Sequence, residues 1–232
     1  MKYYKTDEMF LYNGNCLDLL KRIDNGIIDL TITSPPYNLG NSHHTGSYRH
    51  QSYDDNLPER DYQEQQIEIL NELHRVTRNT GSLIYNHKNR IKKGLQITPY
   101  EWLLKTNWII KQEIVWFNGS QNFDKIRFYP MTERLYWLAK SSKTKLVNNI
   151  NHHDVFNRSE WKPVGTKSRH KRQFPEKMIE DLLACFPDSE VMCDPFMGSG
   201  TVGKIALENN KYFIGCEILK EFFDLSIEEI NS

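Results

Sequence analysis

The sequence predicts an α/β fold with a mostly parallel, twisted sheet that helices cover on both faces. A short β-branched run at 27–33 is typical of a buried strand and ends at Pro35 and Pro36. A glycine-rich turn at 195–200 separates a second predicted strand from a helix. Stretches with helical and with strand periodicity alternate along the chain, which favours parallel strands joined by crossover helices.

Each further element follows from a local pattern. Apolar residues recur at helical spacing through residues 61–77, and the Asn-Thr-Gly sequence at 79–81 is expected to end that helix. Further helices are expected at residues 99–106, 176–186 and 201–209. The remaining predicted strands are residues 82–85, 108–117, 135–139, 190–194 and 212–216.

Two irregular segments interrupt this pattern. Residues 38–58 contain Gly, Ser, Asn, His and Tyr with little periodicity, which predicts a long, mobile loop. From 140 to 172 the apolar periodicity fades and basic residues accumulate, so we expect a short linker or recognition segment there. The length of 232 residues suits a single domain, 1–232, that includes both segments.

Composition restricts the function classes. Charged residues make up 26% of the chain and the formal net charge is zero, so a polyanionic partner must meet a local basic patch. The four cysteines form no CxxC pair and the adjacent histidines lack further ligands at suitable spacing, so we expect free thiols and no metal. The N-terminus lacks the apolar core of a signal peptide, and no apolar run reaches the ~20 residues of a membrane span. These observations favour a cytoplasmic protein.

The glycine-rich loop, residues 194–201, has features of a nucleotide-binding turn. Its sequence is Asp-Pro-Phe-Met-Gly-Ser-Gly-Thr, and its glycines allow a ligand to approach the backbone and the free N–H groups of the next helix. Glu217 ends the next strand, at the spacing where an acid binds ribose hydroxyls. The pattern differs from GxGxxG, which argues against a dinucleotide; the structural alternative is a plain tight turn. The candidate ligand-binding residues are Asp194, Phe196, Gly198, Ser199, Gly200, Thr201 and Glu217.

The Pro-Pro corner, residues 34–37, follows the first predicted strand. Its candidate catalytic residues are Ser34, Pro35, Pro36 and Tyr37. Two prolines make the corner rigid and remove two N–H donors, so the backbone offers only acceptors. The Ser34 hydroxyl and the Pro35 carbonyl can accept hydrogen bonds from an amino group, and Tyr37 offers a flat face for stacking. The structural alternative is a simple turn with a surface tyrosine.

Together these segments resemble the motifs of the DNA amino-methyltransferases, which carry (D/N/S)PPY and DPFxGSGT. The catalytic motif comes first in this chain, an order that resembles the β class, and the resemblance covers nearly the whole chain. It implies a Rossmann-like methyltransferase fold that is circularly permuted, with S-adenosylmethionine as the cofactor. It further implies a short form of the enzyme from a type II restriction-modification system, whose cognate restriction endonuclease acts separately.

The resemblance extends to the cofactor site. The segment 14–18 looks like the family segment that contacts the cofactor adenine, which implies roles for Asn15 and Cys16. The segment with His170 and Phe174 looks like the one that lies over the methionine moiety. For Asp29, amid the apolar residues of the first strand, a contact to the cofactor competes with a purely structural role at a strand edge. We expect the cofactor contact.

The resemblance also implies a mechanism without metal or covalent intermediate. Hydrogen bonds from the amino group to Ser34 and Pro35 would localise the nitrogen lone pair, and orientation can lower the barrier by several kcal/mol. The target base must leave the helix, and Tyr37 would recover part of that cost by stacking. Cytosine-C5 chemistry is excluded, because it uses a Pro-Cys pair in that family and no cysteine here follows a proline.

The sequence leaves the target base open between adenine and cytosine. Ser34 replaces the aspartate common among adenine enzymes, and SPPY is more usual in cytosine-N4 enzymes. The stretch at 33–40, TSPPYNLG, looks more like short β-class adenine enzymes. We expect adenine N6, with cytosine N4 as the alternative. RNA or protein glutamine as the substrate and a non-catalytic nucleic-acid-binding module are less favoured.

Two basic clusters predict contacts to double-stranded DNA, with solvated loops as the alternative. The residues are Lys162, Lys167, Arg169, Lys171 and Arg172 in one cluster and Lys88 and Arg90 in the other. The interval 140–172 is too short for a folded recognition domain. We therefore expect a homodimer that reads a short, relaxed site through its loops.

Overall fold

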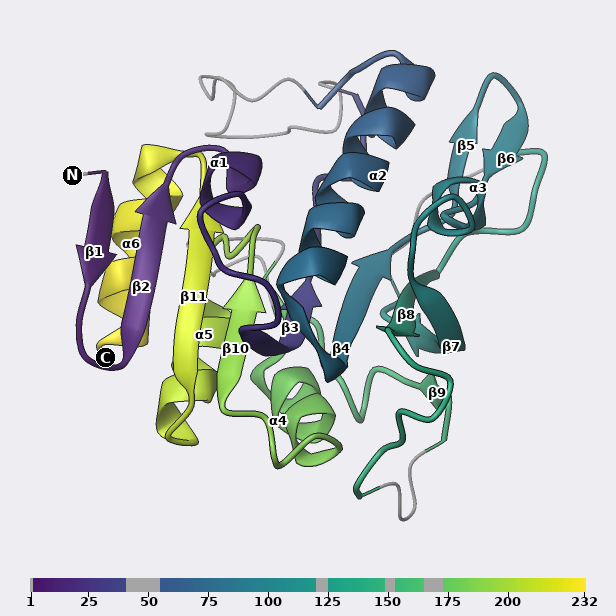
Figure 1. The fold of residues 1–232 in the computed structure, drawn as a ribbon. Coiled ribbons are helices and arrows are strands. Elements are labelled where there is room, and N and C mark those ends of the chain that lie inside the picture. Colours follow the sequence, from purple (N-terminus) through teal and green to yellow (C-terminus); the bar gives the residue numbers. More distant parts are fainter. Residues whose placement is uncertain (1, 41–54, 120–124, 149–152, 165–172) are drawn as a thin grey trace.

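The computed structural model describes residues 2–40, 55–119, 125–148, 153–164 and 173–232. Within them, nine strands form one sheet and two more form a hairpin (Figure 1). The spatial order of the sheet is β1 (Tyr3–Lys5), β2 (Met9–Asn13), β11 (Tyr212–Glu217), β10 (Val191–Asp194), β3 (Ile28–Thr33), β4 (Thr77–His87), β8 (Thr132–Ala139), β7 (Ile109–Phe117) and β9 (Val155–Phe156). The hairpin strands are β5 (Arg90–Lys92) and β6 (Leu95–Ile97).

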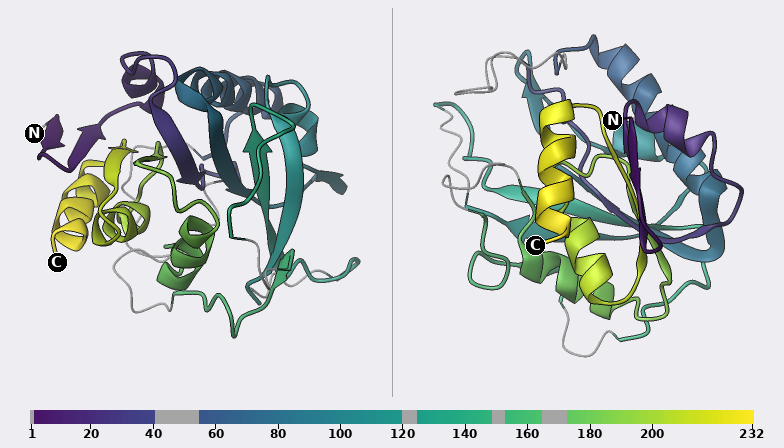
Figure 2. Two further views of the ribbon diagram at one scale, coloured as in Figure 1. Left: turned by 60° about the horizontal axis from the view of Figure 1, so that its bottom comes forward. Right: turned by 90° about the vertical axis from the view of Figure 1, so that its left-hand side faces the viewer.

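Helices cover both faces of the sheet, as Figure 2 shows. They are α1 (Cys16–Leu20), α2 (Glu59–Val76), α3 (Tyr100–Leu103), α4 (Glu176–Ala184), α5 (Thr201–Glu208) and α6 (Lys220–Ile230). Apolar side chains of α1, α2 and α3 form one core with the sheet, and those of α4, α5 and α6 form the other. Burial of two apolar layers against one sheet is the main stabilising contribution to such a fold. The predicted architecture is confirmed.

Strand direction decides where ligands can bind. Strands β2, β11, β10, β3 and β4 run parallel, and β1, β8 and β7 add antiparallel pairings. The carboxyl ends of the parallel strands therefore share one edge of the sheet. In open α/β sheets this edge is where ligands bind. Both segments singled out in the sequence, the Pro-Pro corner after β3 and the glycine-rich loop after β10, begin at this edge.

Several elements differ from the sequence-based expectation. The helix α2 ends at Val76, and β4 already begins at Thr77, so the segment 79–81 does not mark the helix end. Gly81 lies inside β4, where a Cβ atom would come within 2.8 Å of the Asp29 carbonyl oxygen. The glycine thus permits close strand packing beside the register shift between Ile28 and Leu30. The elements that the sequence patterns missed are β1, β2, α1, the β5–β6 hairpin, β9 and α6, most of which are too short for a clear period.

The two irregular segments are described only in part. Residues 41–54 of the predicted loop lie outside the described residues, as do 149–152 and 165–172 of the basic segment. Where the structure describes the chain, none of its helices has the length and apolar character that a bilayer crossing requires.

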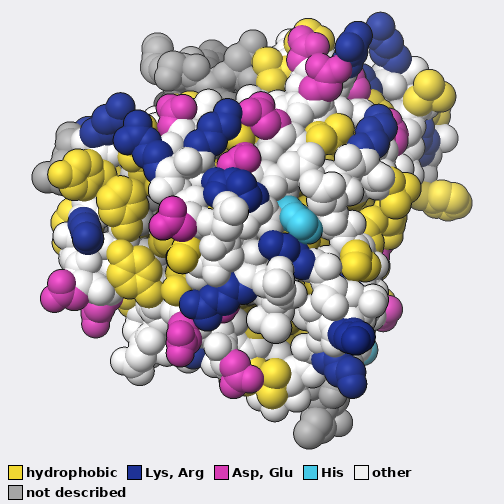
Figure 3. Space-filling view, viewed as in Figure 1, with side chains coloured by type: hydrophobic (Ala, Val, Ile, Leu, Met, Phe, Trp, Pro, Cys, Tyr) yellow, Lys and Arg dark blue, Asp and Glu magenta, His cyan; other side chains and the backbone are white. Residues whose placement is uncertain are grey.

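The surface over β1, β2 and β11 is rich in aromatic side chains, with Lys and Arg side chains among them (Figure 3). A groove of about 520 Å³ lies there, with Tyr3, Phe10 and Tyr12 among its lining residues and Lys2 and Lys5 beside them. Its lining comes from the amino-terminal strands, α1 and β11, so it is separate from the corner and the loop described next.

Candidate active site

The two sequence motifs meet in space through a direct hydrogen bond. Strands β3 and β10 are parallel neighbours, with Leu30 opposite Met192. At their carboxyl ends the Thr33 hydroxyl donates to Asp194 Oδ1 over 2.7 Å. Thr33 immediately precedes the Pro-Pro corner and Asp194 begins the glycine-rich loop, so this bond holds the two motifs side by side.

Asp194 anchors the loop from inside the protein. Its Oδ1 also accepts from the Phe196 N–H at 3.0 Å. Burial raises the pKa of Asp194 to about 7, and the negative charge of Glu217 adds to the rise, whereas the bonds from Thr33 and Phe196 oppose it. Asp194 accepts from β3 and from its own loop, so it fixes the position of the loop relative to β3.

The glycine-rich loop needs its glycines for backbone geometry. Gly198 and Gly200 have φ angles of 53° and 87°, in the left-handed region that favours glycine. A Cβ atom on Gly200 would also lie 2.9 Å from the Ile230 side chain of α6. The loop leads into α5, whose first-turn N–H groups have no intrahelical acceptor and favour an anionic ligand. The buried Thr201 hydroxyl adds a donor that has no partner in the described part of the chain.

Glu217 lies beside the loop at the end of β11. Its Oε2 accepts from the Gly198 N–H at 3.1 Å and its Oε1 from the Leu219 N–H at 2.8 Å. Burial raises the pKa of this carboxyl, and the N–H donors oppose the rise. Each oxygen keeps lone pairs for a second donor, so the carboxylate is held in place and can still accept from ribose hydroxyls.

The segment 13–18 joins this side of the site. The Gly14 N–H and the Asn13 side chain both donate to the Glu217 carbonyl, at 3.1 and 2.8 Å. Asn15 caps α1 by accepting from the Leu17 N–H. Cys16 is buried, and burial raises the pKa of its thiol to about 12, so it is a neutral thiol.

The Pro-Pro corner contacts a second set of polar groups. Ser34 Oγ lies 2.8 Å from the Tyr37 hydroxyl, which donates to Glu133 Oε2 of β8 at 3.0 Å. Asn86 Nδ2 of β4 donates to the same hydroxyl oxygen at 2.6 Å and to Glu133 Oε2 at 3.0 Å. Burial and the Glu133 charge raise the pKa of Tyr37 well above its ordinary value, so the phenol stays protonated. One side of the Tyr37 ring packs against His87, with ring centroids 4.5 Å apart.

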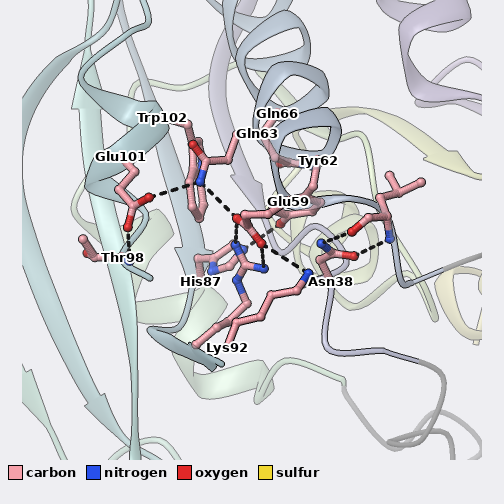
Figure 4. A network of polar contacts seen from close by, with 12 residues as sticks. Asn38, Glu59, Tyr62, Gln63, Gln66, His87, Lys92, Thr98, Glu101 and Trp102 are labelled. Atoms are coloured by element: carbon pink, nitrogen blue, oxygen red, sulfur yellow. Dashed lines mark hydrogen bonds and ion pairs between the residues drawn. The ribbon is translucent and has the colours of Figure 1, made fainter. Parts of the chain in front are cut away.

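Helix α2 supports the corner through Tyr62, which belongs to the polar network around Glu59 that Figure 4 shows. The Tyr62 hydroxyl donates to the Pro36 carbonyl at 2.8 Å and lies 2.8 Å from His87 Nε2. Which atom of the Tyr62–His87 pair donates depends on the ring tautomer. The other ring nitrogen, Nδ1, lies 2.8 Å from the Lys88 carbonyl oxygen and 2.9 Å from the Lys88 N–H. Burial lowers the pKa of His87 to about 3, so the ring is neutral in this network.

Comparison with known proteins identifies the family. Residues 28–228 match the N6_N4_Mtase family, described as DNA methylase. The chain belongs to this family of DNA methylases. Membership confirms the predicted amino-methyltransferase of restriction-modification systems and its cofactor, S-adenosylmethionine. The family name covers both N6 and N4 targets, so it does not distinguish adenine from cytosine.

Individual relatives agree with this assignment. The type II methyltransferase M.ScaI of Streptomyces caespitosus is 26% identical, over 99% of this chain and 84% of its own length. M.HpaI of Haemophilus parainfluenzae is 29% identical, over 94% of this chain and 73% of its own length. Among solved structures, the PvuII DNA methyltransferase (cytosine-N4-specific) superposes with a TM-score of 0.78 at 21% identity, covering 97% of this chain and 87% of its own. This likeness confirms the Rossmann-like fold; the circular permutation stays a prediction.

Two predicted site residues of the methylase have other roles in the structure. The Asp29 carboxylate accepts from the Glu190 and Val191 N–H groups and pairs with Arg78 at 2.9 Å. Asp29 lies near the start of β3, at the opposite end from the Pro-Pro corner, so its expected cofactor contact is corrected to a structural one.

The prediction of a DNA contact for Arg90 is also corrected. Its side chain is 3% exposed and forms two hydrogen bonds to Glu59, at 2.7 and 2.9 Å. The guanidinium lies over the rings of Tyr62 and Trp102, 4.8 and 5.6 Å from their centroids. The guanidinium therefore packs on Tyr62, which in turn bonds to the corner, and it is not exposed to a phosphate in this structure.

The remaining residues are found partly within and partly outside the described part of the chain, and their contacts to cofactor and DNA stay predictions. Lys162 is exposed and Lys88 is half-buried. Phe174 is partly buried and packs against the core near α4. The predictions for Lys167, Arg169, His170, Lys171 and Arg172 lie outside the described residues.

Sequence reasoning missed Asn86, Asn118 and Glu133, the polar groups around the corner. The Asn118 side chain donates to Glu133 Oε1 at 3.0 Å. Glu133 and Asn86 each lie at the end of an apolar strand segment, in TERLYWLA and SLIYNH. The short polar stretches that border these runs, residues 132–134 and 86–87, are the signal that could have identified them.

Proposed function

We propose that this methylase transfers a methyl group to N6 of adenine in a short site of double-stranded DNA. The observation that carries methyl transfer to an amino group is the Thr33–Asp194 hydrogen bond, because it sets the acceptor-rich corner beside the glycine-rich loop. Adenine is supported by the stretch TSPPYNLG, which resembles short adenine enzymes.

Cytosine N4 is the second candidate target, and Ser34 favours it. A serine at the head of the corner is more usual in cytosine-N4 enzymes. The PvuII methyltransferase, described as cytosine-N4-specific, has the same fold, although at 21% identity the likeness concerns the fold alone. The Ser34 hydroxyl can accept from either amino group, so the side chain permits both targets.

The chain's own residues supply orientation and hydrogen bonds. When bound, S-adenosylmethionine supplies a methyl group already activated on a sulfonium. Glu217 would bind the ribose hydroxyls with its remaining lone pairs, and Thr201 and the first turn of α5 would bind the anionic end of the donor. The Pro36 carbonyl is committed to Tyr62, so Ser34 Oγ and the Pro35 carbonyl would accept the two amino hydrogens.

The test offers tritiated S-adenosylmethionine separately to duplex DNA, RNA and protein, and then analyses the nucleosides of the labelled DNA. We expect label in DNA as N6-methyladenine. Recovery of N4-methylcytosine alone would replace adenine by cytosine. Label in RNA or protein with none in DNA would reject the proposed substrate class. Ser34→Ala, which removes one acceptor, should lower incorporation in the same assay.

We further propose a homodimer that methylates a short, relaxed site, with a separately acting restriction endonuclease, in the cytoplasm. The shortness of the interval 140–172 supports a small recognition surface, to which a second subunit would add contacts. Each base-edge contact contributes about 1–3 kcal/mol of discrimination, so few contacts leave one-base variants as substrates. Light scattering that gives a monomer at every concentration, or methylation confined to one long sequence, would reject the respective part.

A further inference from the structure

Glu133 lies outside both family motifs, yet its carboxylate accepts hydrogen bonds from side chains in and around the Pro-Pro corner. Three side chains donate to it: Tyr37 and Asn86 to Oε2 and Asn118 to Oε1, all at 3.0 Å. These donors come from the corner itself, from β4 and from the end of β7. Glu133 is thus held by donors from three segments, and its side chain is partly buried near the start of β8.

The Glu133 carboxylate decides the direction of the hydrogen bonds that lead to Ser34. A carboxylate can only accept hydrogen bonds, so the Tyr37 hydroxyl donates its single proton to the bond with Glu133. The Tyr37 oxygen is then an acceptor for the Ser34 hydroxyl, 2.8 Å away. Ser34 therefore donates toward Tyr37, and its oxygen lone pairs remain acceptors. Asn86 Nδ2 faces one of them at 3.4 Å, which leaves the other for a further donor. Without the carboxylate, Tyr37 can turn its proton toward Ser34 and occupy one of those lone pairs.

Asn86 contributes a second sign of an unfilled acceptor site beside the corner. Its Nδ2 donates to Tyr37 at 2.6 Å and Glu133 at 3.0 Å, and Ser34 Oγ is a third, more distant acceptor at 3.4 Å. Its Oδ1 is buried and has no hydrogen-bond partner among the residues that the structure describes. A buried acceptor without a partner costs free energy unless a ligand or water supplies a donor. Both the serine and the asparagine thus offer acceptors at the place where an amino group is expected.

We propose that Glu133 is a positioning residue for methyl transfer: acting through Tyr37, it holds the Ser34 hydroxyl as a hydrogen-bond acceptor for the amino group of the target base. The proposal rests on the proposed function and deepens it. In this proposal a carboxylate on β8 helps to align the nitrogen lone pair of the base. The first residue of the corner, Ser34, is itself uncharged. Its effect is on the orientation of the base in the reacting complex, so it concerns kcat more than donor binding.

The test is a double-mutant cycle of Glu133→Gln and Tyr37→Phe, with kcat, KM for DNA and the Kd of S-adenosylmethionine measured for each protein. Glu133→Gln keeps the shape and removes the charge that fixes the Tyr37 proton. We expect kcat to fall on the order of tenfold to a hundredfold, as for loss of one charge-assisted hydrogen bond, with donor Kd unchanged. In the Tyr37→Phe background, Glu133→Gln should change kcat less than about twofold, because the connection is already broken.

The matched control is Glu113→Gln on the neighbouring strand β7. Glu113 pairs with Arg134 at 2.8 Å and has no contact with Tyr37 among those recorded for the described chain, so kcat should stay within about twofold. An equal fall in this control, independent effects of Glu133 and Tyr37 in the cycle, or an unchanged kcat in Glu133→Gln would each overturn the proposal. Absence of methylation by the wild-type protein on every nucleic acid would instead reject the proposed function.

A second variant serves if Glu133→Gln folds poorly, as judged by its thermal transition. Asn118→Ala removes the donor to the other carboxylate oxygen and leaves Glu133 charged. The same mechanism then predicts a smaller fall in kcat that disappears in the Tyr37→Phe background. A fall of equal size in both backgrounds would indicate a structural effect on β7 and overturn the proposal.

Discussion

The glycine-rich loop and the Pro-Pro corner lie on neighbouring strand ends, but they are held by different kinds of contact. At the loop, Asp194 accepts from the Phe196 N–H two residues on. Glu217 accepts from the N–H groups of Gly198, 19 residues earlier, and Leu219, two residues later. The corner is held by side chains of α2, β4 and β8, remote in sequence, such as Tyr62 and Glu133. Apart from the Thr33 bond, the loop is therefore held by contacts close in sequence, whereas the corner depends on the assembled fold.

The largest expected effect is on stability, and it tests whether the buried contacts that support the corner stabilise the assembled fold. Glu59→Ala leaves the Arg90 guanidinium buried without its bidentate partner, which we expect to lower the free energy of unfolding by about 3–5 kcal/mol. Urea denaturation measures it. The control is Glu64→Ala on the same helix, whose pair with Arg60 is exposed, and its change should be far smaller. Equal changes in the two variants would mean that the corner does not depend on this buried pair.

The second prediction concerns the loop. Glu217→Ala removes the carboxylate that faces the loop, and we expect a loss of about 1.5–3 kcal/mol in binding of S-adenosylmethionine. Calorimetry measures the affinity, and Glu208→Ala, an exposed acid at the end of α5, is the control with no expected change. Unchanged affinity in Glu217→Ala would remove this residue from the donor site.

The third prediction uses the charge of Asp194. The pKa of this carboxyl is raised to about 7 in the fold from an ordinary 3.8, so between these values the folded state holds a proton that the unfolded state releases. Stability should therefore fall as pH rises from about 4 to 7, by at most about 1.4 kcal/mol per pH unit from this group. Asp194→Asn should flatten the slope in urea titrations at several pH values. The exposed Asp188→Asn should leave it as in the wild type.

The smallest expected effect concerns the one bond that joins the two regions. Thr33→Val removes the donor to Asp194, and we expect a loss of about 1 kcal/mol in stability together with a lower kcat. The control is Thr31→Val on the same strand, because the buried Thr31 hydroxyl has, among the described residues, no partner beyond a weak contact with the Cys193 thiol. If the two variants behave alike in urea denaturation and in the methylation assay, the Thr33 bond does not couple corner and loop.

Much of the fold and of the loop was predictable because the signals are local. The β-branched run before Pro35, the turn at 195–200 and the acid at Glu217 each depend on neighbours within about one element. Backbone requirements such as the positive φ of Gly198 and Gly200 are specific to residue type, so the sequence shows them directly. The helices and strands α2, β4, β10, α5 and β11 were predicted from local sequence patterns in the same way.

The roles of single charged and polar residues were decided only by tertiary structure. Asp29 and Arg90 were predicted as ligand contacts, but Asp29 meets N–H groups 161 and 162 residues away and Arg90 meets Glu59 from α2. Glu133 gained its place beside Tyr37 because β8 pairs with β4, which lies next to β3. The sequence alone determines which side chains carry a charge. The partner and the exposure of each charged side chain depend on which strands and helices pack together, because these contacts join residues far apart in the chain.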